Sequence, residues 1–382
     1  MKIVYVSNYF AQHQEELSLE LSRRTEGQYR FIATEPFPPS RRSSGYVDLN
    51  HKYDFILRDY ESHDQAALAK KLANECDVLM VGSAPTHYLI DRMEKDRLSV
   101  IYSERPFKKG TWRRFIPKTR KKVYDRFLRF RHQNVLVLCA SSYTASDIAL
   151  CGFPVEKCLK WGYFPEVRRY ELGDLMAKKE HSDVELLWVA RFLECKHPEL
   201  PLEVIRRLSS EGHKARLTMI GDGELRSSME RKAQQLGVAQ RVTFTGSIPT
   251  ERVRDTMERS NIFLFTSDRM EGWGAVVNEA MNSGCAVVCS DAAGAGQYLI
   301  ENEKNGMLYR YGDNDGLYER VLQLCRDSAA CRAMGEQAYE TITGTWCAPV
   351  AAERLCEVLE ARIRGENITQ MYEQGPCSPV RK

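Results

Sequence analysis

The sequence lacks the features that mark secreted, disulfide-bonded or membrane-spanning proteins. It has twelve cysteines, but none forms a C-x-x-C pair, and several lie in apolar stretches, as is typical of free thiols in a reducing cytoplasm. The start, MKIVYVSNYF, lacks the long apolar core and cleavage site of a signal peptide. No run approaches the ~18 to 20 apolar residues that a membrane-spanning helix needs. We therefore expect a cytoplasmic protein, for which any membrane contact would be peripheral.

Composition and length instead indicate a soluble globular protein with two domains. Of the 382 residues, 43% are hydrophobic and 28% are charged. The net charge of +3 is unevenly distributed, because residues 105–132 hold twelve Lys or Arg and a single acid, Asp125. This segment carries +11 and leaves −8 for the rest of the chain. A basic segment on an otherwise acidic protein predicts one dedicated anionic partner.

Short apolar runs rich in Val and Ile recur in both halves of the chain and predict strands. They cover 2–7, 29–34, 76–82, 99–103 and 134–140, and then 184–190, 215–221, 241–246, 261–266 and 285–290. Helical patterns lie between several of them, at 64–74, 198–211, 224–236, 250–258 and 274–283. Alternating strands and helices predict parallel sheets that are covered on both faces. The fold class that we predict is therefore α/β, with two doubly wound parallel-sheet domains.

Changes in composition predict the domain boundaries. Residues 165–183 are polar without a period-2 pattern, as is typical of a linker, and the polar tail at 366–382 is expected to be loosely ordered. The predicted parts are an N-terminal domain at 1–164, a linker at 165–183, a C-terminal domain at 184–345, a helix at 346–365 that returns to the N-terminal domain, and the tail at 366–382. Ligands bind beyond the carboxyl ends of such strands, so two facing domains would enclose an interdomain cleft with the linker as hinge.

The stretch EGWGAVVNEAM at 271–281 places acids at both ends of an apolar run. Glu271 follows a predicted strand, and Glu279 would lie one to two turns into a helix that starts near Gly274. Free N–H groups at a helix start bind anions, and a carboxylate nearby can accept hydrogen bonds from a ribose diol. The alternative is an acidic first turn that the helix dipole stabilises.

Two cations leave the carboxyl end of the first predicted strand of the second domain. Arg191 follows this strand directly and Lys196 comes five residues later, so both would point toward Glu271. Two cations beside a helix N-terminus can bind a diphosphate. A pair of solvated surface cations is the alternative, which the presence of both glutamates makes less favourable.

These residues together resemble a known family. Arg191, Lys196, GDGEL at 221–225, FTGSIP at 244–249 and the E-x7-E of Glu271 and Glu279 are similar in order and spacing to the nucleotide-sugar domain of retaining GT-B glycosyltransferases, family four (group 1). The first half resembles the family more weakly, because SNYFAQHQ stands where many members carry a glycine-rich loop. SERPFKKG and KWGYFPE resemble a subgroup associated with bacterial surface polysaccharides. The resemblance implies a GT-B fold.

The resemblance also implies a role for each residue of a donor site. Arg191 and Lys196 would neutralise the leaving diphosphate, Glu279 would bind the ribose, and Glu271 would hold the donor sugar for attack. The other donor-binding residues that it implies are Gly272, Trp273, Gly274, Gly221, Gly223, Gly246 and Ile248. Members retain the anomeric configuration and usually need no metal, and no cofactor is expected here. Two cations and a helix terminus can offset the charge of a diphosphate, so this expectation is physically coherent.

Polar residues after strand ends of the first half are candidates for the acceptor side. His13 would face the cleft, where an imidazole could shift protons near neutral pH, and His87 follows another strand end. Glu104 could serve as an acceptor-side base, while Arg105 and Lys108 could meet an acceptor phosphate. The alternatives are a polar helix start for His13 and a surface ion pair for Glu104 and its neighbours.

The basic segment 105–132 interleaves aromatic residues with its cations. The residues that we expect at a membrane are Trp112, Arg113, Arg114, Phe115, Lys121 and Lys122. Aromatic residues among Lys and Arg are typical of an element that lies on an anionic leaflet. One alternative is a solvated basic face whose aromatics enter the core. A single-stranded nucleic acid is another, but nothing else in the chain resembles a nucleic-acid module, so no nucleic acid is expected.

Asp313-Asn314-Asp315 forms a D-x-D string, which metal-dependent transferases of another fold use for manganese. Here the string lies in a Gly-flanked turn just before a predicted helix. A side chain that caps the helix explains it, and we therefore predict no metal site.

The sequence thus predicts a retaining glycosyltransferase of the cytoplasm that is peripheral at the inner face of the plasma membrane. It would move a hexose-type sugar from a nucleotide donor, with uridine as the expected nucleoside, to a lipid-linked or polysaccharide-precursor acceptor. The alternatives are a nucleotide-sugar epimerase or hydrolase on the same fold, and a nucleotide-sugar binding protein without catalysis.

Overall fold

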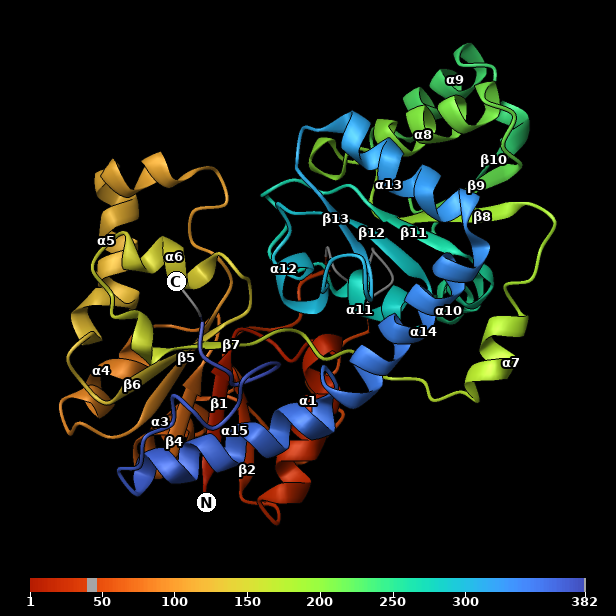
Figure 1. The fold of residues 1–382 in the computed structure, drawn as a ribbon. Helices are drawn as coiled ribbons and strands as arrows, with labels where there is room; N and C mark the ends of the chain where they lie inside the picture. Colours follow the sequence, from red (N-terminus) through yellow and green to blue (C-terminus); the bar gives the residue numbers. More distant parts are fainter. Residues whose placement is uncertain (40–46, 381–382) are drawn as a thin grey trace. The chain divides into compact units, whose positions relative to one another are not determined.

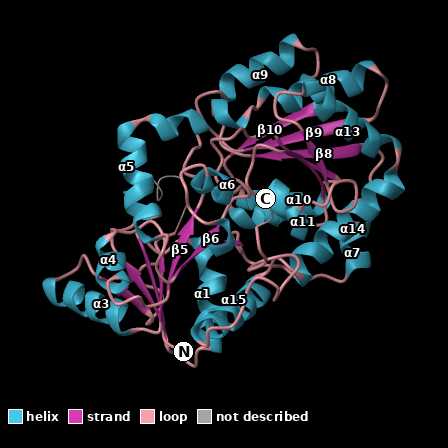
Figure 2. Ribbon diagram, turned by 60° about the vertical axis from the view of Figure 1, so that its left-hand side comes forward, coloured by secondary structure: helices cyan, strands magenta, loops and turns pink. Residues whose placement is uncertain are grey.

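The computed structural model describes residues 1–39 and 47–380 and divides the chain into two compact units. The first unit comprises Met1–Glu166 and Trp346–Lys382, and the second comprises Val167–Thr345. Each unit is built on one parallel sheet with helices on both of its faces (Figures 1 and 2). The predicted α/β class with two doubly wound domains is therefore confirmed.

The sheet of the first unit has seven strands in the order β3-β2-β1-β4-β5-β6-β7. These strands are β1 (Ile3–Ser7), β2 (Tyr29–Ala33), β3 (Ile56–Arg58), β4 (Val78–Val81), β5 (Ser99–Ser103), β6 (Val135–Cys139) and β7 (Cys158–Lys160). The helices are α1 (Gln12–Arg24), α3 (His63–Glu75), α4 (His87–Met93), α5 (Pro117–Arg126), α6 (Thr144–Ala149) and α15 (Ala348–Ile363), with 3-10 turns η1 (Thr111–Phe115), η2 (Leu128–Phe130) and η3 (Val155–Lys157).

The sheet of the second unit has six strands in the order β10-β9-β8-β11-β12-β13. These strands are β8 (Val184–Val189), β9 (Ala215–Ile220), β10 (Val242–Gly246), β11 (Ile262–Phe265), β12 (Ala286–Ser290) and β13 (Met307–Tyr309). The helices are α7 (Leu172–Ala177), α8 (Glu199–Ser210), α9 (Arg226–Gln235), α10 (Thr250–Arg259), α11 (Ala275–Asn282), α12 (Gly296–Leu299), α13 (Asn314–Arg326) and α14 (Ser328–Gly344), with 3-10 turns η4 (Glu194–Lys196) and η5 (Ala239–Arg241).

All ten strands that the sequence predicted are present, because each is a short apolar run that pairs with its neighbours in a parallel sheet. The three strands that it missed, β3, β7 and β13, are three residues long and lie at sheet edges. Runs this short carry no readable alternation or apolar excess. In each sheet the strand order reverses once, between β1 and β4 and between β8 and β11. These two switch points are where doubly wound sheets bind ligands.

The structure differs from the linker predicted at 165–183. Residues from Val167 onward belong to the second unit, and α7 buries Leu175 and Met176. The polar composition was misleading because Lys179 is itself buried, where its ammonium donates to the carbonyls of Met257 and Ser260 at 2.9 and 2.7 Å. A lysine whose charge is satisfied by backbone oxygens can be buried with the apolar residues beside it.

The end of the chain also differs from the loosely ordered tail that the sequence predicted. The helix predicted at 346–365 is α15, which packs against α1. Beyond it, Cys377 and Ser378 are fully buried, and the backbone of 377–379 pairs with β7: Lys160 N–H donates to the Ser378 carbonyl at 2.8 Å. Backbone pairing of this kind leaves no mark on composition. The last two residues of the predicted tail, 381–382, lie outside the described residues.

The twelve cysteines all lie in the described part of the chain, and all of them are free thiols. Over residues 1–39 and 47–380, no helix combines the length and the apolar composition that crossing a bilayer requires.

Candidate functional site

The switch point of the second sheet carries the charged residues that the sequence singled out. Arg191 follows β8, and Lys196 ends η4 a few residues later. Glu271 lies in the loop between β11 and α11, and Glu279 lies within α11. Strands β8 and β11 are neighbours in the sheet. The fold of the second unit therefore brings all four residues to the edge where a doubly wound sheet binds ligands.

Lys196 and Glu271 form an ion pair with each other, between the ammonium and the Oε2 atom. Their side chains are only 15% and 20% exposed, so the pair is largely shielded from solvent. Thr266 supports the turn behind Lys196, because its hydroxyl donates to the Lys196 carbonyl at 2.6 Å and accepts from the Trp188 indole at 3.0 Å. Sequence reasoning placed both charges in one site but did not predict that they would pair.

By contrast, the side chains of Arg191 and Glu279 make no hydrogen bond or ion pair with any residue that the structure describes. Arg191 is exposed, and its guanidinium makes no hydrogen bond or ion pair within residues 1–39 and 47–380. Glu279 is half-buried, and its carboxylate accepts no hydrogen bond from any described residue. Burial raises the pKa of Glu279, and the charges of Arg254 and Arg168 oppose that shift. A half-buried carboxylate without a donor is costly for the protein alone, and a ligand hydroxyl would satisfy it.

The start of α11 offers backbone N–H groups to the same site. Gly274 precedes the helix with a φ of 95°, and a Cβ at this position would lie 2.6 Å from the Phe265 ring. Both the left-handed conformation and the close approach therefore require glycine. No side chain caps the helix, so its first N–H groups remain available to an anion.

The Trp273 side chain points into the core, so only its backbone could lie along a donor as the resemblance implies. Its indole is fully buried and donates to the Asn278 side-chain carbonyl at 2.8 Å, so the residue anchors the loop onto α11. Gly272 is also buried. Only the backbone of 272–274 is therefore left to face a donor. The motif identifies the loop correctly, but the sequence does not predict that the tryptophan side chain is buried in the core.

The glycines of GDGEL have a packing role that needs no ligand. Gly221 and Gly223 both have positive φ, and a Cβ on either would collide with the backbone of the loop that follows β8, at Ala190 and Phe192 respectively. The two loops touch along their backbones, so the glycines hold the loop that carries Arg191. This contact supports the candidate site from the β9 side.

Gly246 and Ile248 lie further along the same edge of the sheet. Gly246 ends β10, and its carbonyl accepts a hydrogen bond from Gly221 N–H at 3.0 Å. Ile248 is half-buried in the loop between β10 and α10. FTGSIP therefore borders the carboxyl edge beyond GDGEL, which is compatible with the base-binding position that the resemblance implies.

The D-x-D string is explained by the fold around it. Asp313 is the N-cap of α13, and its carboxylate accepts from Gly316 N–H at 2.8 Å, which confirms the capping role that the sequence predicted. Asp315 pairs with Arg207 at 2.7 Å.

In the first unit, Tyr163 contacts two of the acceptor-side candidates, His13 and Glu104, although the sequence did not single it out. Tyr163 donates its hydroxyl to Oε1 of Glu104 at 2.5 Å, and Lys108 pairs with Oε2 at 2.6 Å. The His13 ring stacks on Tyr163, with 4.1 Å between ring centroids. Burial raises the pKa of Tyr163 well above its usual range, and the nearby Glu104 adds to this shift. Both carboxylate oxygens of Glu104 are thus occupied by partners from the first unit.

Arg105 and His87 lie in different surroundings from this group. Arg105 is buried, and its guanidinium contacts both oxygens of Asp147 at 3.3 Å and stacks over Tyr143. This geometry gives Arg105 a structural role rather than the contact with an acceptor phosphate that we expected. His87 is exposed at the start of α4 and lies against the neighbouring Tyr88.

The aromatic residues of the basic segment 105–132 divide into two sets. Phe107, Phe127 and Phe130 enter the core of the first unit, as the alternative interpretation expected. Trp112 and Phe115 on η1 are 59% and 69% exposed, and Tyr124 on α5 is 51% exposed. The cations Lys121 and Lys122 are exposed, and Arg113 and Arg114 are half-buried beside the aromatics. The structure therefore leaves a set of bulky apolar side chains outside the core among the cations.

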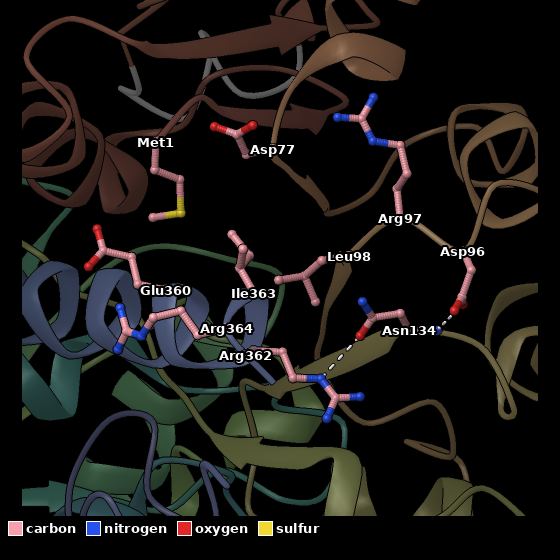
Figure 3. Close-up of a pocket in the computed structure, with 10 residues that line it drawn as sticks. All are labelled: Met1, Asp77, Asp96, Arg97, Leu98, Asn134, Glu360, Arg362, Ile363 and Arg364. Carbon is pink, nitrogen blue, oxygen red and sulfur yellow. Dashed lines mark hydrogen bonds between the residues drawn. The ribbon is translucent and has the colours of Figure 1, made fainter. Parts of the chain in front are cut away.

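A cavity of about 530 Å³ lies in the first unit, away from the candidate residues (Figure 3). Its lining comes from residues that precede β4, β5 and β6 and from the end of α15, so it opens at the amino ends of the strands. The Arg362 guanidinium donates a hydrogen bond to the Asn134 side-chain oxygen, and the Asn134 backbone N–H donates to the Asp96 carboxylate. Its acids and arginines are equal in number, and doubly wound sheets bind ligands at the opposite edge. We assign no role to this cavity.

Sequence reasoning missed Tyr163 and, in the second unit, His197. Tyr163 lies in KWGYFPE, a motif whose resemblance was noted without a role for any single residue. His197 directly follows Lys196 and contacts Glu199, Asp268 and Tyr311. Neither residue has a sequence signal of its own, because most of their partners, such as Glu104 for Tyr163 and Asp268 and Tyr311 for His197, come from distant parts of the chain.

Comparison with solved structures places the fold. The chain aligns over 94% of its length with the whole of Anabaena HepE, solved in complex with UDP, at a TM-score of 0.70 and 14% identity. It aligns over 94% of its length with 99% of WaaG, a glycosyltransferase of lipopolysaccharide biosynthesis, at a TM-score of 0.60 and 14% identity. Identities this low show the fold alone, which is GT-B as the sequence predicted.

Comparison with protein families identifies the second unit. Residues 176–341, which lie within the second unit, match the family described as glycosyl transferases group 1. The matched segment contains Arg191, Lys196, Glu271 and Glu279.

Curated relatives align with similar shares of this chain and of their own length. A lipopolysaccharide core biosynthesis glycosyltransferase of Rhizobium meliloti is 26% identical over 46% of this chain and 49% of its own. An N-acetyl-alpha-D-glucosaminyl L-malate synthase of Bacillus anthracis is 27% identical over 47% of each chain. The chain thus spans about half the length of these relatives.

Proposed function

We propose that this protein is a retaining glycosyltransferase that moves a hexose-type sugar from a UDP-sugar to a lipid-linked or polysaccharide-precursor acceptor at the inner face of the membrane. The observation that carries the proposal is the set of four charged groups at the β8–β11 switch point beside the uncapped start of α11. Similarity to lipopolysaccharide glycosyltransferases supports the acceptor class. The complexes of Anabaena HepE with UDP and UDP-glucose support uridine as the nucleoside.

The cations would act on the leaving diphosphate. Its negative charge grows as the glycosidic bond breaks, so contacts with Arg191 and Lys196 strengthen toward the transition state. Arg191 is free to make this contact. Lys196 would exchange part of its ion pair with Glu271 for the phosphate, which would release Glu271 to accept from hydroxyls of the donor sugar. Two cations and a helix N-terminus could offset the diphosphate charge without a metal ion.

Glu279 would bind the ribose of the donor. Its carboxylate has no hydrogen-bond donor among the described residues, and a vicinal diol offers two. The group must be ionised to accept both bonds. Because burial raises its pKa, donor binding through Glu279 should weaken on acidification earlier than it would with an ordinary glutamate.

The acceptor side would be held at the membrane through the basic segment 105–132. The exposed Trp112, Phe115 and Tyr124 can insert among headgroups, and the neighbouring cations can attract an anionic leaflet. Each cation near such a surface contributes ~1 kcal/mol. A peripheral attachment of this kind would bring the first unit to a lipid-linked acceptor.

A screen of nucleotide sugars by thermal shift tests the donor. A ligand at 100 times its Kd adds ~2.7 kcal/mol of stability, so the true donor should raise Tm clearly. UDP-sugars should do so more than GDP- or ADP-sugars. Binding without any transfer or hydrolysis would favour a nucleotide-sugar binding protein, and a product with an inverted ring carbon would favour an epimerase.

Metal independence is tested by assaying donor turnover in EDTA. Activity should persist after chelation and should not rise when manganese is added. Loss of activity in EDTA with recovery in manganese would contradict the proposal that Arg191, Lys196 and the start of α11 offset the diphosphate charge without a metal ion.

A further inference from the structure

His197 holds a strained backbone conformation next to Lys196. Its φ of 48° lies in the left-handed region, which is unfavourable for an L-residue and which glycine adopts freely. The residue follows η4 and precedes Pro198. This backbone places an imidazole at a position that glycine would occupy without strain.

The His197 ring contacts the start of α8 in its own segment and two other loops at the carboxyl edge of the second sheet. Nδ1 lies 2.9 Å from Oε1 of Glu199, at the start of α8. Nε2 lies 3.3 Å from the Tyr311 hydroxyl, just beyond β13, and 3.8 Å from Oδ2 of Asp268, just beyond β11. The histidine is 24% exposed, so these contacts are partly shielded from water.

These contacts connect directly to the Lys196–Glu271 pair. Asp268 N–H donates to the Cys195 carbonyl at 3.0 Å, and Glu271 N–H donates to the Asp268 carbonyl at 3.1 Å. The loop that carries Glu271 is therefore fastened to the loop that carries Lys196 at Asp268. His197 reinforces this junction from the Lys196 side.

We propose that His197 is a positioning residue of the donor site, which in its imidazolium form holds the Asp268 loop against the Lys196 turn so that Lys196 and Glu271 keep the spacing that a nucleoside diphosphate sugar requires. This inference rests on the proposed function, because it assigns His197 to the site where the diphosphate would bind.

The charges around His197 favour the imidazolium. Glu199 and Asp268 face the ring, Tyr311 contacts it from beyond β13, and Lys196 is its chain neighbour with its charge paired to Glu271. The hydrogen bond with Glu199 is the largest cause that raises the pKa of His197, burial opposes it, and Asp268 adds to the rise. A raised pKa means that the charged contacts are fully present below the ordinary value of about 6.5 and are lost as the pH rises through the higher folded value.

Three variants test this role. His197→Gly removes the ring and suits the left-handed backbone, so a loss cannot be blamed on strain. His197→Asn tolerates the same backbone and keeps a neutral side chain that can hydrogen-bond. His213→Asn, before β9 at the opposite edge of the sheet, is the matched control.

UDP binding is measured by calorimetry from about pH 6 to about pH 8.5, above and below the expected transition. Wild type and His213→Asn should lose affinity several-fold as the pH rises. His197→Gly should stay folded but bind UDP about tenfold more weakly at low pH, with a flat pH profile, and His197→Asn should have a flat profile and an intermediate affinity. Donor turnover should show the same order.

The outcomes separate this inference from the proposed function. Wild-type binding of UDP with an unchanged pH profile in His197→Gly overturns the positioning role alone. If wild type binds none of UDP, GDP and ADP, both proposals fall. A histidine NMR titration, with the His197 signal identified by its loss in His197→Asn, adds a readout without nucleotide. A midpoint at or below that of free histidine would also overturn the role.

Discussion

The carboxyl edges of the two sheets use charge in opposite ways. In the second unit, Arg191 and Glu279 have no hydrogen-bond partner among the described residues, although each stands at a switch-point loop or helix. In the first unit, Glu104 is occupied by Tyr163 and Lys108, and Arg105 is buried against Asp147. Exposed or unsatisfied charges such as Arg191 and Glu279 are directly available to a ligand, whereas a buried ion pair such as Arg105–Asp147 contributes to the protein's own structure.

This contrast distinguishes two kinds of strand-end residue that look alike in the sequence. Arg105 and Arg191 both come shortly after a strand, and only the fold shows that one is 9% exposed in an ion pair and the other is exposed and unpaired. Substitution of each arginine should therefore affect different properties. The predictions below test this difference, from the largest expected effect to the smallest.

Arg105→Ala should lower the free energy of unfolding by about 3 to 5 kcal/mol, because it leaves the Asp147 carboxylate buried without its cation. Urea denaturation measures the change. Arg191→Ala is the matched control, and its stability should stay within about 0.5 kcal/mol of wild type, as is usual for an exposed side chain. Equal stability of the two variants would show that the first unit does not depend on this pair.

Replacement of Arg113, Arg114, Lys121 and Lys122 by Ser should abolish binding to anionic vesicles. At ~1 kcal/mol for each cation the loss is ~4 kcal/mol, or about a thousandfold in partitioning. UDP-sugar binding by the second unit should be unchanged, and sedimentation with vesicles measures the difference. A control with Lys214, Arg231, Arg252 and Arg326 replaced by Ser removes equal charge from exposed positions of the second unit.

Vesicle binding by wild type should also weaken as salt is added, because exposed charges are screened. If the wild-type protein does not bind anionic vesicles at low salt, the proposed membrane attachment is contradicted, and a soluble acceptor becomes the better hypothesis.

Arg191→Ala and Lys196→Ala should each lower donor turnover by about 100- to 1000-fold, or ~3 to 4 kcal/mol of transition-state stabilisation. UDP-sugar affinity should fall much less, since the charge on the diphosphate develops as the bond breaks. Steady-state kinetics and calorimetry separate the two effects, with Lys214→Ala as control. A loss of affinity equal to the loss of turnover would indicate simple ground-state binding instead.

Glu279→Gln should weaken UDP binding by about tenfold, which corresponds to one lost charge-assisted hydrogen bond of ~1.5 kcal/mol. Wild-type affinity should fall as the pH drops through the raised pKa of Glu279, because protonation removes the acceptor, and the variant should lack this fall. Calorimetry over a pH series measures both. Glu251→Gln, on the exposed first turn of α10, should behave like wild type. An unchanged affinity in Glu279→Gln would remove this residue from the donor site.

The amino-acid sequence by itself determined the two parallel sheets, the placement of their longer strands, and the grouping of four charged residues at one edge of the second sheet. Strand runs, helical periods and motif spacing are local properties, and the parallel topology then brings strand ends to one edge without further information. That is why Arg191, Lys196, Glu271 and Glu279 could be grouped from their positions relative to predicted strands.

Only the tertiary structure decided which side chains pair and which face solvent. It buried Trp273 against Asn278, joined Lys196 to Glu271, closed Arg105 onto Asp147 and gathered Glu199, Asp268 and Tyr311 around His197. Most of these contacts join residues that lie far apart in the chain. The free energy of a charged group depends on its burial and on the partners that the fold brings within hydrogen-bonding distance. Neither its burial nor its distant partners can be predicted from the neighbouring residues in the sequence.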